Sequence, residues 1–134
     1  MAYWLLKTEP GDYAFEDLAA AEKDVWDGVR NPVALRNLRR MQPGDLAFIY
    51  HTADERSVVG IAEVVTTPYN DDSGFPAVDV AARRRLPHPV SLRAIKADGR
   101  FIDWELVRLP RLSVVPVPAA FWDAVLEMAG ASQL

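Results

Sequence analysis

Two runs of β-branched and aromatic residues lie close together near the middle of the chain, at residues 46–50 and 58–65. Residues of these kinds favour β-strands, and the polar residues between the runs, 52–56, are typical of a connecting loop. Strands that follow one another across a short loop pair in the antiparallel sense. We therefore expect an antiparallel pair of strands here, with the rest of the chain packed around it.

The remaining segments change irregularly between strand and helix patterns. A second helix is expected to begin at Asn31, where an Asx cap precedes a proline at the first helical position. We expect further strands at 2–7, 77–81 and 111–117, helices at 15–22 and 119–128, and a short helix or turn at 90–97, whereas 101–109 fits neither pattern clearly. Because strands and helices do not alternate regularly, the sequence favours an α+β fold with a small β-barrel or a curled mixed sheet over a βαβ repeat.

The size and composition of the chain limit its class. With 134 residues it can form one hydrophobic core, and we expect a single domain over residues 1–134. The chain has no cysteine and only two histidines, His51 and His88, so we expect no disulfide, no metal site and no cofactor. No apolar run approaches the roughly 20 residues that span a bilayer, and no secretory signal precedes the first strand. We therefore expect a cytoplasmic monomer without membrane contact, and the Arg- and Ala-rich composition indicates a bacterial origin.

Charge is unevenly distributed along the chain. The 19 acidic and 15 basic residues give a net charge of −4. Such a protein does not coat duplex phosphate without selectivity, because that affinity depends on many Lys and Arg contacts. The arginines nevertheless cluster at 36–40, 83–85 and 108–111. Either a local basic rim or solvated arginines that balance neighbouring acids fits this pattern.

Residues 26–31, Trp-Asp-Gly-Val-Arg-Asn, place an aromatic ring, a turn, a cation and an amide just before a helix. Trp26 precedes the turn and could project into a cleft, where an indole stacks on a nucleobase for about 1 to 3 kcal/mol, or it could be an ordinary core aromatic. Arg30 is harder to assign to a core, because a buried guanidinium needs partners, whereas Asn31 is explained as a helix cap. The stretch suits a planar polar ligand.

Two strand ends carry polar groups that could reach the same place. Lys7 and Thr8 follow the first strand, and Tyr50, His51 and Thr52 end another. His51 could be a general base, which needs an oriented partner, a hydrogen-bonding group on a pocket wall, or a structural histidine. No catalytic-triad spacing, phosphate-binding loop, His-Glu-x-x-His motif or dinucleotide fingerprint accompanies it, so catalysis has little support.

Six motifs in the same order together resemble the EVE domain family, and the resemblance spans almost the whole chain. They are residues 3–10 (Tyr-Trp-Leu-Leu-Lys-Thr-Glu-Pro), residues 26–31, the turn at 44–45, residues 50–52 (Tyr-His-Thr), residues 59–64 (Val-Gly-Ile-Ala-Glu-Val) and residues 111–117. The resemblance implies a PUA-like fold, a small curled β-barrel with peripheral helices that is related to YTH domains. It also implies a non-catalytic reader of modified bases in nucleic acid.

Single residues can be carried over from that resemblance. Trp26 resembles the cage tryptophan of YTH domains, Lys7 and Thr8 resemble their Lys-Ser at the end of the first strand, and residues 60–63 resemble their Gly-Val-Ala-Glu strand. Two departures stand out. Some family members have Ala-Arg-Asn where this chain has Ala-Leu-Arg-Asn at 34–37, and Phe75 stands where YTH domains place a second cage aromatic.

These observations lead to one hypothesis, that a single modified or flipped base of DNA or RNA enters a pocket lined by Trp26. Trp4 or Tyr50 is expected to form a second wall, while Asn31, His51 and Thr52 meet the base edge. The residues expected to bind the ligand are Trp4, Lys7, Thr8, Trp26, Val29, Arg30, Asn31, Tyr50, His51 and Thr52. Arg30 and Lys7, together with Arg36 or Arg111, are expected to meet the phosphates.

Two alternatives remain open at this point. An enzyme acting on a nucleotide or nucleic acid would use His51 with a nearby acid such as Glu9. A protein-interaction module would instead show an exposed apolar patch and no polar cleft.

Overall fold

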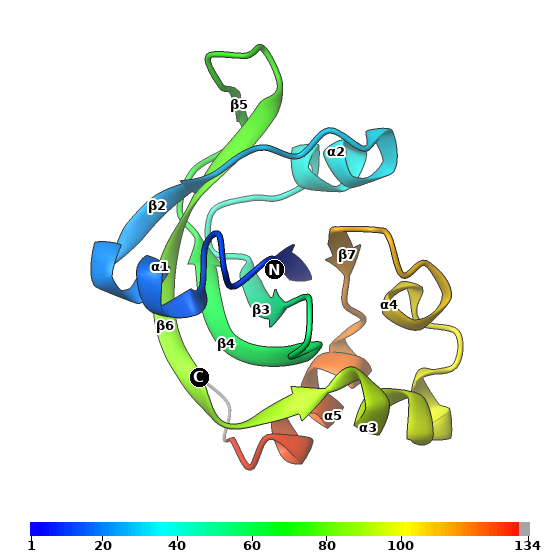
Figure 1. The fold of residues 1–134 in the computed structure, drawn as a ribbon. Helices are drawn as coiled ribbons and strands as arrows, with labels where there is room; N and C mark the ends of the chain where they lie inside the picture. Colours follow the sequence, from blue (N-terminus) through cyan, green and yellow to red (C-terminus); the bar gives the residue numbers. More distant parts are fainter. Residues whose placement is uncertain (132–134) are drawn as a thin grey trace.

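The computed structural model describes residues 1–131 and shows a curled mixed sheet with helices around its outside (Figure 1). The strands are β1 (Tyr3–Thr8), β2 (Lys23–Trp26), β3 (Leu46–His51), β4 (Ser57–Val64), β5 (Tyr69–Asn70), β6 (Pro76–Ser91) and β7 (Val114–Pro116). The helices are α1 (Phe15–Ala21), α2 (Pro32–Arg39), α3 (Leu92–Ala97), α4 (Glu105–Arg108) and α5 (Ala119–Met128), with a 3-10 turn η1 at Gly99–Phe101. The predicted α+β class is confirmed.

The sheet has the order β2-β6-β4-β3-β1-β7, and β5 pairs with β6 outside this path. The predicted antiparallel pairing of β3 with β4 is confirmed. β1 pairs with β3 in parallel, so that Thr8 lies opposite His51 and the two strands end at the same edge of the sheet. This register is what brings the end of β1 next to the end of β3.

The long strand β6 produces the curl. It pairs with β2 over its first half and with β4 along most of its length. Irregularities in the β4 pairing, between Val58 and Gly60 and again between Ile61 and Ala62, bend the strands and increase their twist. Within residues 1–131, no pairing joins the two edge strands β2 and β7.

Stacked rings join α5 to the sheet. The Trp122 ring lies between Phe48 and Tyr3, with centroid distances of 3.8 and 4.4 Å. Trp104 is also fully buried, and its indole N–H donates to the Pro116 carbonyl at 2.9 Å. Both tryptophans therefore serve as packing anchors.

The structure differs from the sequence prediction in three segments. β2 was not predicted, because its sequence Lys-Asp-Val-Trp has no apolar alternation and its pairing partner lies more than fifty residues away. β6 runs to Ser91 rather than ending near residue 81, although the part beyond residue 81 contains three arginines and two prolines. Residues 101–109, which the sequence left open, contain the end of η1 and the short helix α4.

The position of Gly60 on β4 has no room for a side chain, and its replacement tests how closely β4 packs against Phe15. A Cβ at this position would lie 2.5 Å from the ring of Phe15, which is itself buried. We expect Gly60→Ala to lower the free energy of unfolding by about 1 to 3 kcal/mol, as overpacking does in other cores. Gly99→Ala is the matched control, since a Cβ there meets nothing within 4 Å. Chemical denaturation of both variants checks the prediction, and equal stability of the two would contradict it.

Candidate functional site

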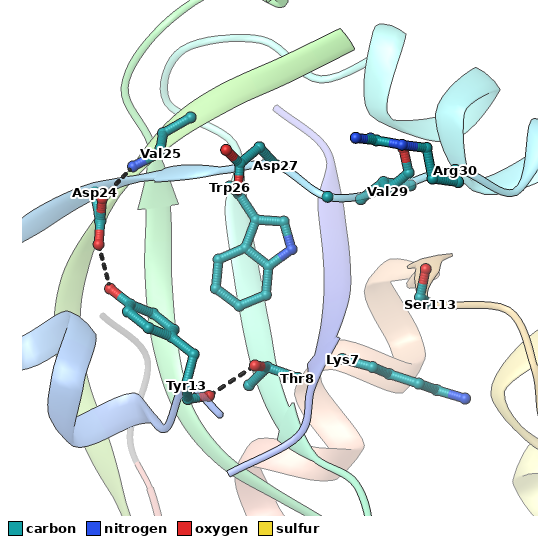
Figure 2. A pocket seen from close by; sticks show the side chains of 11 residues that line it. Lys7, Thr8, Tyr13, Asp24, Val25, Trp26, Asp27, Val29, Arg30 and Ser113 are labelled. Carbon is teal, nitrogen blue, oxygen red and sulfur yellow. Dashed lines mark hydrogen bonds between the residues drawn. The ribbon is translucent and has the colours of Figure 1, made fainter. Parts of the chain in front are cut away.

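A cavity of about 440 Å³ opens beside the end of β2 (Figure 2). It falls in the size range of small-molecule pockets, roughly 300 to 1,000 Å³. Four segments supply its walls: the end of β1, the turn before α1, β2 with the loop that follows it, and the residue before β7. The lining residues are Lys7, Thr8, Tyr13, Asp24, Val25, Trp26, Asp27, Gly28, Val29, Arg30 and Ser113.

Trp26 is the last residue of β2, and its indole forms one wall of this cavity (Figure 2). The side chain is only 8% exposed, so most of the ring is held by the protein and one part of it faces the hollow. In Figure 2 its nitrogen is turned toward the side of Ser113 and Arg30. No residue among 1–131 accepts a hydrogen bond from Nε1. The indole therefore offers both an aromatic surface and a free donor.

Tyr13 is the second aromatic residue of the cavity. Its ring meets Trp26 edge-on, with centroids 6.3 Å apart and an interplanar angle of 80°. Its hydroxyl donates to Asp24 Oδ2 at 2.6 Å, and Thr8 Oγ1 donates to its carbonyl at 2.7 Å. Burial and the neighbouring Asp24 carboxylate both raise the pKa of Tyr13, so the hydroxyl stays protonated at neutral pH and keeps donating. This wall is rigidly positioned.

Arg30 borders the cavity from the loop after β2. Its guanidinium carbon lies 4.0 Å from the centre of the Phe75 ring, and Nη1 donates to the Val29 carbonyl at 3.0 Å. Gly28, with φ of +78°, makes the turn that leads there. Phe75 does not line the cavity, so it supports the arginine instead of forming the second aromatic wall.

Lys7 and Ser113 lie on the opposite side. The backbone N–H of Lys7 donates to the Ser113 carbonyl at 3.0 Å, which draws the residue before β7 into the wall. The Lys7 ammonium donates to the Pro110 carbonyl at 2.8 Å, and burial lowers the pKa of this lysine. Lys7 and Ser113 therefore form this wall of the cavity, with the Lys7 ammonium turned away from the indole and toward Pro110 (Figure 2).

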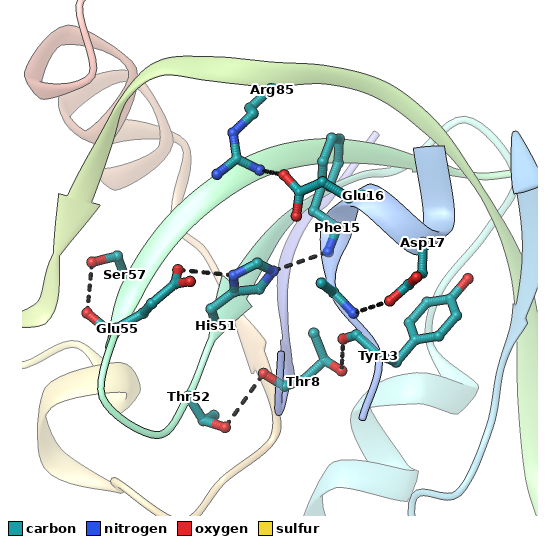
Figure 3. Close-up of polar contacts among 11 residues, drawn as sticks. Thr8, Tyr13, Phe15, Glu16, Asp17, His51, Thr52, Glu55, Ser57 and Arg85 are labelled. Atoms are coloured by element: carbon teal, nitrogen blue, oxygen red, sulfur yellow. Dashed lines mark hydrogen bonds and ion pairs between the residues drawn. The ribbon is translucent and has the colours of Figure 1, made fainter. Parts of the chain in front are cut away.

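His51 has a structural role. It is 1% exposed, and its Nε2 accepts a hydrogen bond of 2.9 Å from the Phe15 N–H (Figure 3). Because Nε2 is an acceptor, the neutral ring carries its proton on Nδ1, which lies 2.9 Å from Glu55 Oε2. Both ring nitrogens are occupied within the protein, and His51 does not line the cavity where the sequence analysis expected it to meet a base edge.

Asn31 is also explained by the fold. Its side-chain oxygen accepts from the backbone N–H groups of Val33 and Ala34, at 2.9 and 3.1 Å, and so caps α2 as predicted. The residue does not line the cavity. The turn that precedes it, residues 27–30, lines the cavity instead.

Neither of the two aromatic residues expected to form the second wall, Trp4 and Tyr50, lines this cavity. Trp4 lies near the start of β1, whereas the cavity lies at its end, and its indole N–H donates to Asp45 Oδ2 at 2.9 Å. Tyr50 and Thr52 line a separate hollow that shares Lys7 with the cavity. Tyr13 is the wall that the sequence analysis missed, and Asp24 and Ser113 were missed with it.

The arginines assigned to phosphate lie outside this cavity. Arg36 is exposed on α2, and Arg111 is exposed on the segment before β7. Neither lines the hollow. Among the predicted ligand-binding residues, the cavity brings together Lys7, Thr8, Trp26, Val29 and Arg30.

Residues 1–131 contain no cluster of three or more His, Asp or Glu side chains arranged to hold a metal ion. None of the helices in this range has the length and apolar character needed to cross a membrane.

The fold and the cavity define a small α+β domain with an open aromatic pocket bordered by cations. Its sheet and helices have the PUA-like arrangement that the sequence analysis predicted. The model of the EVE domain matches residues 2–128, and the chain belongs to this family.

Known relatives agree with that assignment. The NMR structure of Rpa0253 from Rhodopseudomonas palustris is 40% identical with a TM-score of 0.92, covering 97% of this chain and 94% of that one. Thymocyte nuclear protein 1 of Gallus gallus is 32% identical over 129 residues, which are 83% of this chain and 53% of the chicken protein. This chain therefore spans about half the length of that relative. The crystal structure of human THYN1 in complex with 5-methylcytosine-containing DNA shares the fold, with a TM-score of 0.89 at 24% identity, covering 99% of this chain and all of that one.

Proposed function

We propose that the domain binds nucleic acid without catalysing a reaction, by holding one modified base in the cavity beside Trp26. The observation that carries this proposal is the indole itself, largely buried but facing a 440 Å³ hollow with its N–H unused by residues 1–131. Aromatic faces hold bases by stacking for about 1 to 3 kcal/mol per base.

The other walls supply polar groups suited to the edge of a base. Base edges carry both donors and acceptors. The cavity offers a donor from Trp26 Nε1, a hydroxyl from Ser113 and an exposed carboxylate from Asp27. Stacking does not discriminate among bases, and these polar groups supply the selectivity.

The net charge of the domain and the size of the pocket bear on whether it binds a duplex or a single strand. A net charge of −4 does not favour a duplex bound along its length. One pocket for one base favours a single strand or a site where the base is already flipped out, since extracting a base from a duplex costs a few kcal/mol. The DNA in the human THYN1 complex contains 5-methylcytosine, which makes that base the first candidate to test here.

The alternative of a catalytic role depended on His51 as a general base. With both ring nitrogens of His51 engaged, by Phe15 and Glu55, neither is available to a substrate. The binding proposal needs no general base and uses only groups that face the cavity.

Binding measurements on modified and unmodified strands test the proposal. We expect a single-stranded oligonucleotide with one 5-methylcytosine to bind about fourfold more tightly than its unmodified counterpart, since burying one methyl group contributes about 0.8 kcal/mol. Fluorescence anisotropy should be measured with DNA and RNA strands and with N6-methyladenine for comparison. Equal affinity for every strand would refute base-modification reading. Recovery of the oligonucleotide chemically changed would refute the non-catalytic assignment.

A further inference from the structure

A second hollow, of about 310 Å³, lies on the other side of Lys7. Polar or charged groups line it from four segments: Lys7 on β1, Tyr50 on β3, Thr52 and Arg56 in the loop after β3, and Lys96 on α3. Because Lys7 also lines the base cavity, the two hollows adjoin at this residue.

The charge of this hollow contrasts with that of the whole domain. Its described lining contains three cations, Lys7, Arg56 and Lys96, and no carboxylate. The domain as a whole has four more acidic than basic residues. Asp54 and Glu55 lie beside Arg56 and Lys96 but line an adjoining hollow. A hollow whose own lining is cationic in an acidic protein favours an anionic ligand.

Tyr50 provides an independent indication of a ligand. The residue is 3% exposed, yet its hydroxyl has no hydrogen-bond partner among residues 1–131. Since the side chain lines the hollow and is otherwise enclosed, its free O–H donor is directed there. Burial raises the pKa of Tyr50, with the nearby Arg56 guanidinium acting in the opposite direction. The hydroxyl is thus a protonated donor beside a cation.

Backbone contacts hold the cationic elements in place. The N–H of Leu92, the first residue of α3, donates to the Arg56 carbonyl at 2.7 Å. This contact ties α3, and with it Lys96, to the loop that carries Arg56. The Lys7 ammonium lies 5.6 Å from the centre of the Tyr50 ring. The backbone segments that carry Arg56 and Lys96 are therefore held next to each other by the fold.

We propose that this hollow binds a backbone phosphate of the same strand whose base occupies the cavity beside Trp26, through the Tyr50 hydroxyl and the cations Lys7, Arg56 and Lys96. This inference rests on the proposed function. Charge-assisted hydrogen bonds to phosphate oxygens are strong and position a strand without reading its sequence. A base in one hollow and a phosphate in the next would fix the direction of the strand across Lys7.

Two charge reversals on α3 provide a matched test. Lys96 lines the hollow. Arg93 lies on the same helix and is exposed like Lys96, but it does not line this hollow. Lys96→Glu should weaken binding of the modified oligonucleotide roughly tenfold and lower the salt dependence of binding by about one ion. Arg93→Glu changes the net charge equally and should have a much smaller effect. Equal losses in both variants would overturn the proposal, because they would reflect only overall charge.

Ligands of increasing size separate this inference from the proposed function. The modified nucleoside alone, its 5′- and 3′-monophosphates and a short oligonucleotide are titrated into the wild type, Lys96→Glu and Tyr50→Phe. We expect the nucleoside to bind all three equally and the phosphorylated ligands to bind the two variants more weakly. If the nucleoside binds but the phosphorylated ligands bind no more tightly than the nucleoside to the wild type or to either variant, the phosphate site alone is overturned. Binding of inorganic phosphate that is independent of the base would also overturn it, because the anion site would then have no connection to the base cavity. Absence of nucleoside binding would reject the base cavity, and with it this inference.

Discussion

Replacing Trp26 by alanine is expected to lower the affinity for a modified oligonucleotide by about 5- to 150-fold, the equivalent of one lost base stack. The indole is the largest aromatic surface of the cavity and also supplies an unused donor. Its removal takes away the stacking partner and one contact to the base edge at the same time. Isothermal titration or fluorescence anisotropy with the same strand measures the loss.

Trp26→Phe separates binding from folding. The substitution keeps an aromatic face on β2 but removes the indole N–H, so it should cost less affinity than alanine while leaving a folded domain. Trp26→Ala also empties part of a largely buried site, and its unfolding should be followed by denaturant to confirm that the binding-competent protein is native. If a folded Trp26→Ala domain bound as tightly as the wild type, the aromatic cavity would not be the binding site.

Replacing His51 by alanine is expected to lower the free energy of unfolding by about 2 to 4 kcal/mol. The ring is buried and its Nε2 is the acceptor for the Phe15 N–H at the start of α1. Its loss leaves that donor unsatisfied, which costs about 1 to 3 kcal/mol, and it also leaves a void. The midpoint of urea unfolding, compared with the wild type, measures the change.

Glu55 provides the control for His51. Its carboxylate contacts Nδ1 but is half exposed, so Glu55→Gln should change stability by no more than about 1 kcal/mol. A structural His51 predicts a large difference between the two variants. If His51→Ala were as stable as the wild type and instead abolished turnover of a nucleic acid, the residue would be catalytic and the account of this site would be wrong.

Local patterns in the sequence were sufficient for much of the fold. The β3–β4 pair is marked by two apolar runs around a polar loop, and α5 begins and ends where its sequence pattern predicts. The cap of α2 at Asn31 is encoded in adjacent residues, an Asx followed by proline. In each case the information lies within a few positions of the element that it defines.

Non-local pairing accounts for what the sequence analysis missed. β2 is a short, polar edge strand that exists because β6 pairs with it, and without β2 the residue Asp24 could not be placed beside Tyr13. The choice among the three interpretations of His51 depends on Phe15, which lies 36 positions earlier in the chain. Trp26 could be recognised from its turn and from the resemblance to a known family, whereas its neighbours in the cavity come from four separate segments.

The indole N–H signals of the four tryptophans offer the most direct test of the central claim. In ¹H–¹⁵N spectra, the Nε1–H of Trp4 and that of Trp104 are already donated to Asp45 and Pro116, whereas that of Trp26 is free in residues 1–131. The Trp26 signal is assigned by its absence from Trp26→Phe. On titration with an oligonucleotide carrying 5-methylcytosine, we expect the Trp26 signal to shift strongly and saturate while those of Trp4 and Trp104 stay in place. Saturable binding that leaves the Trp26 signal unmoved would contradict the account.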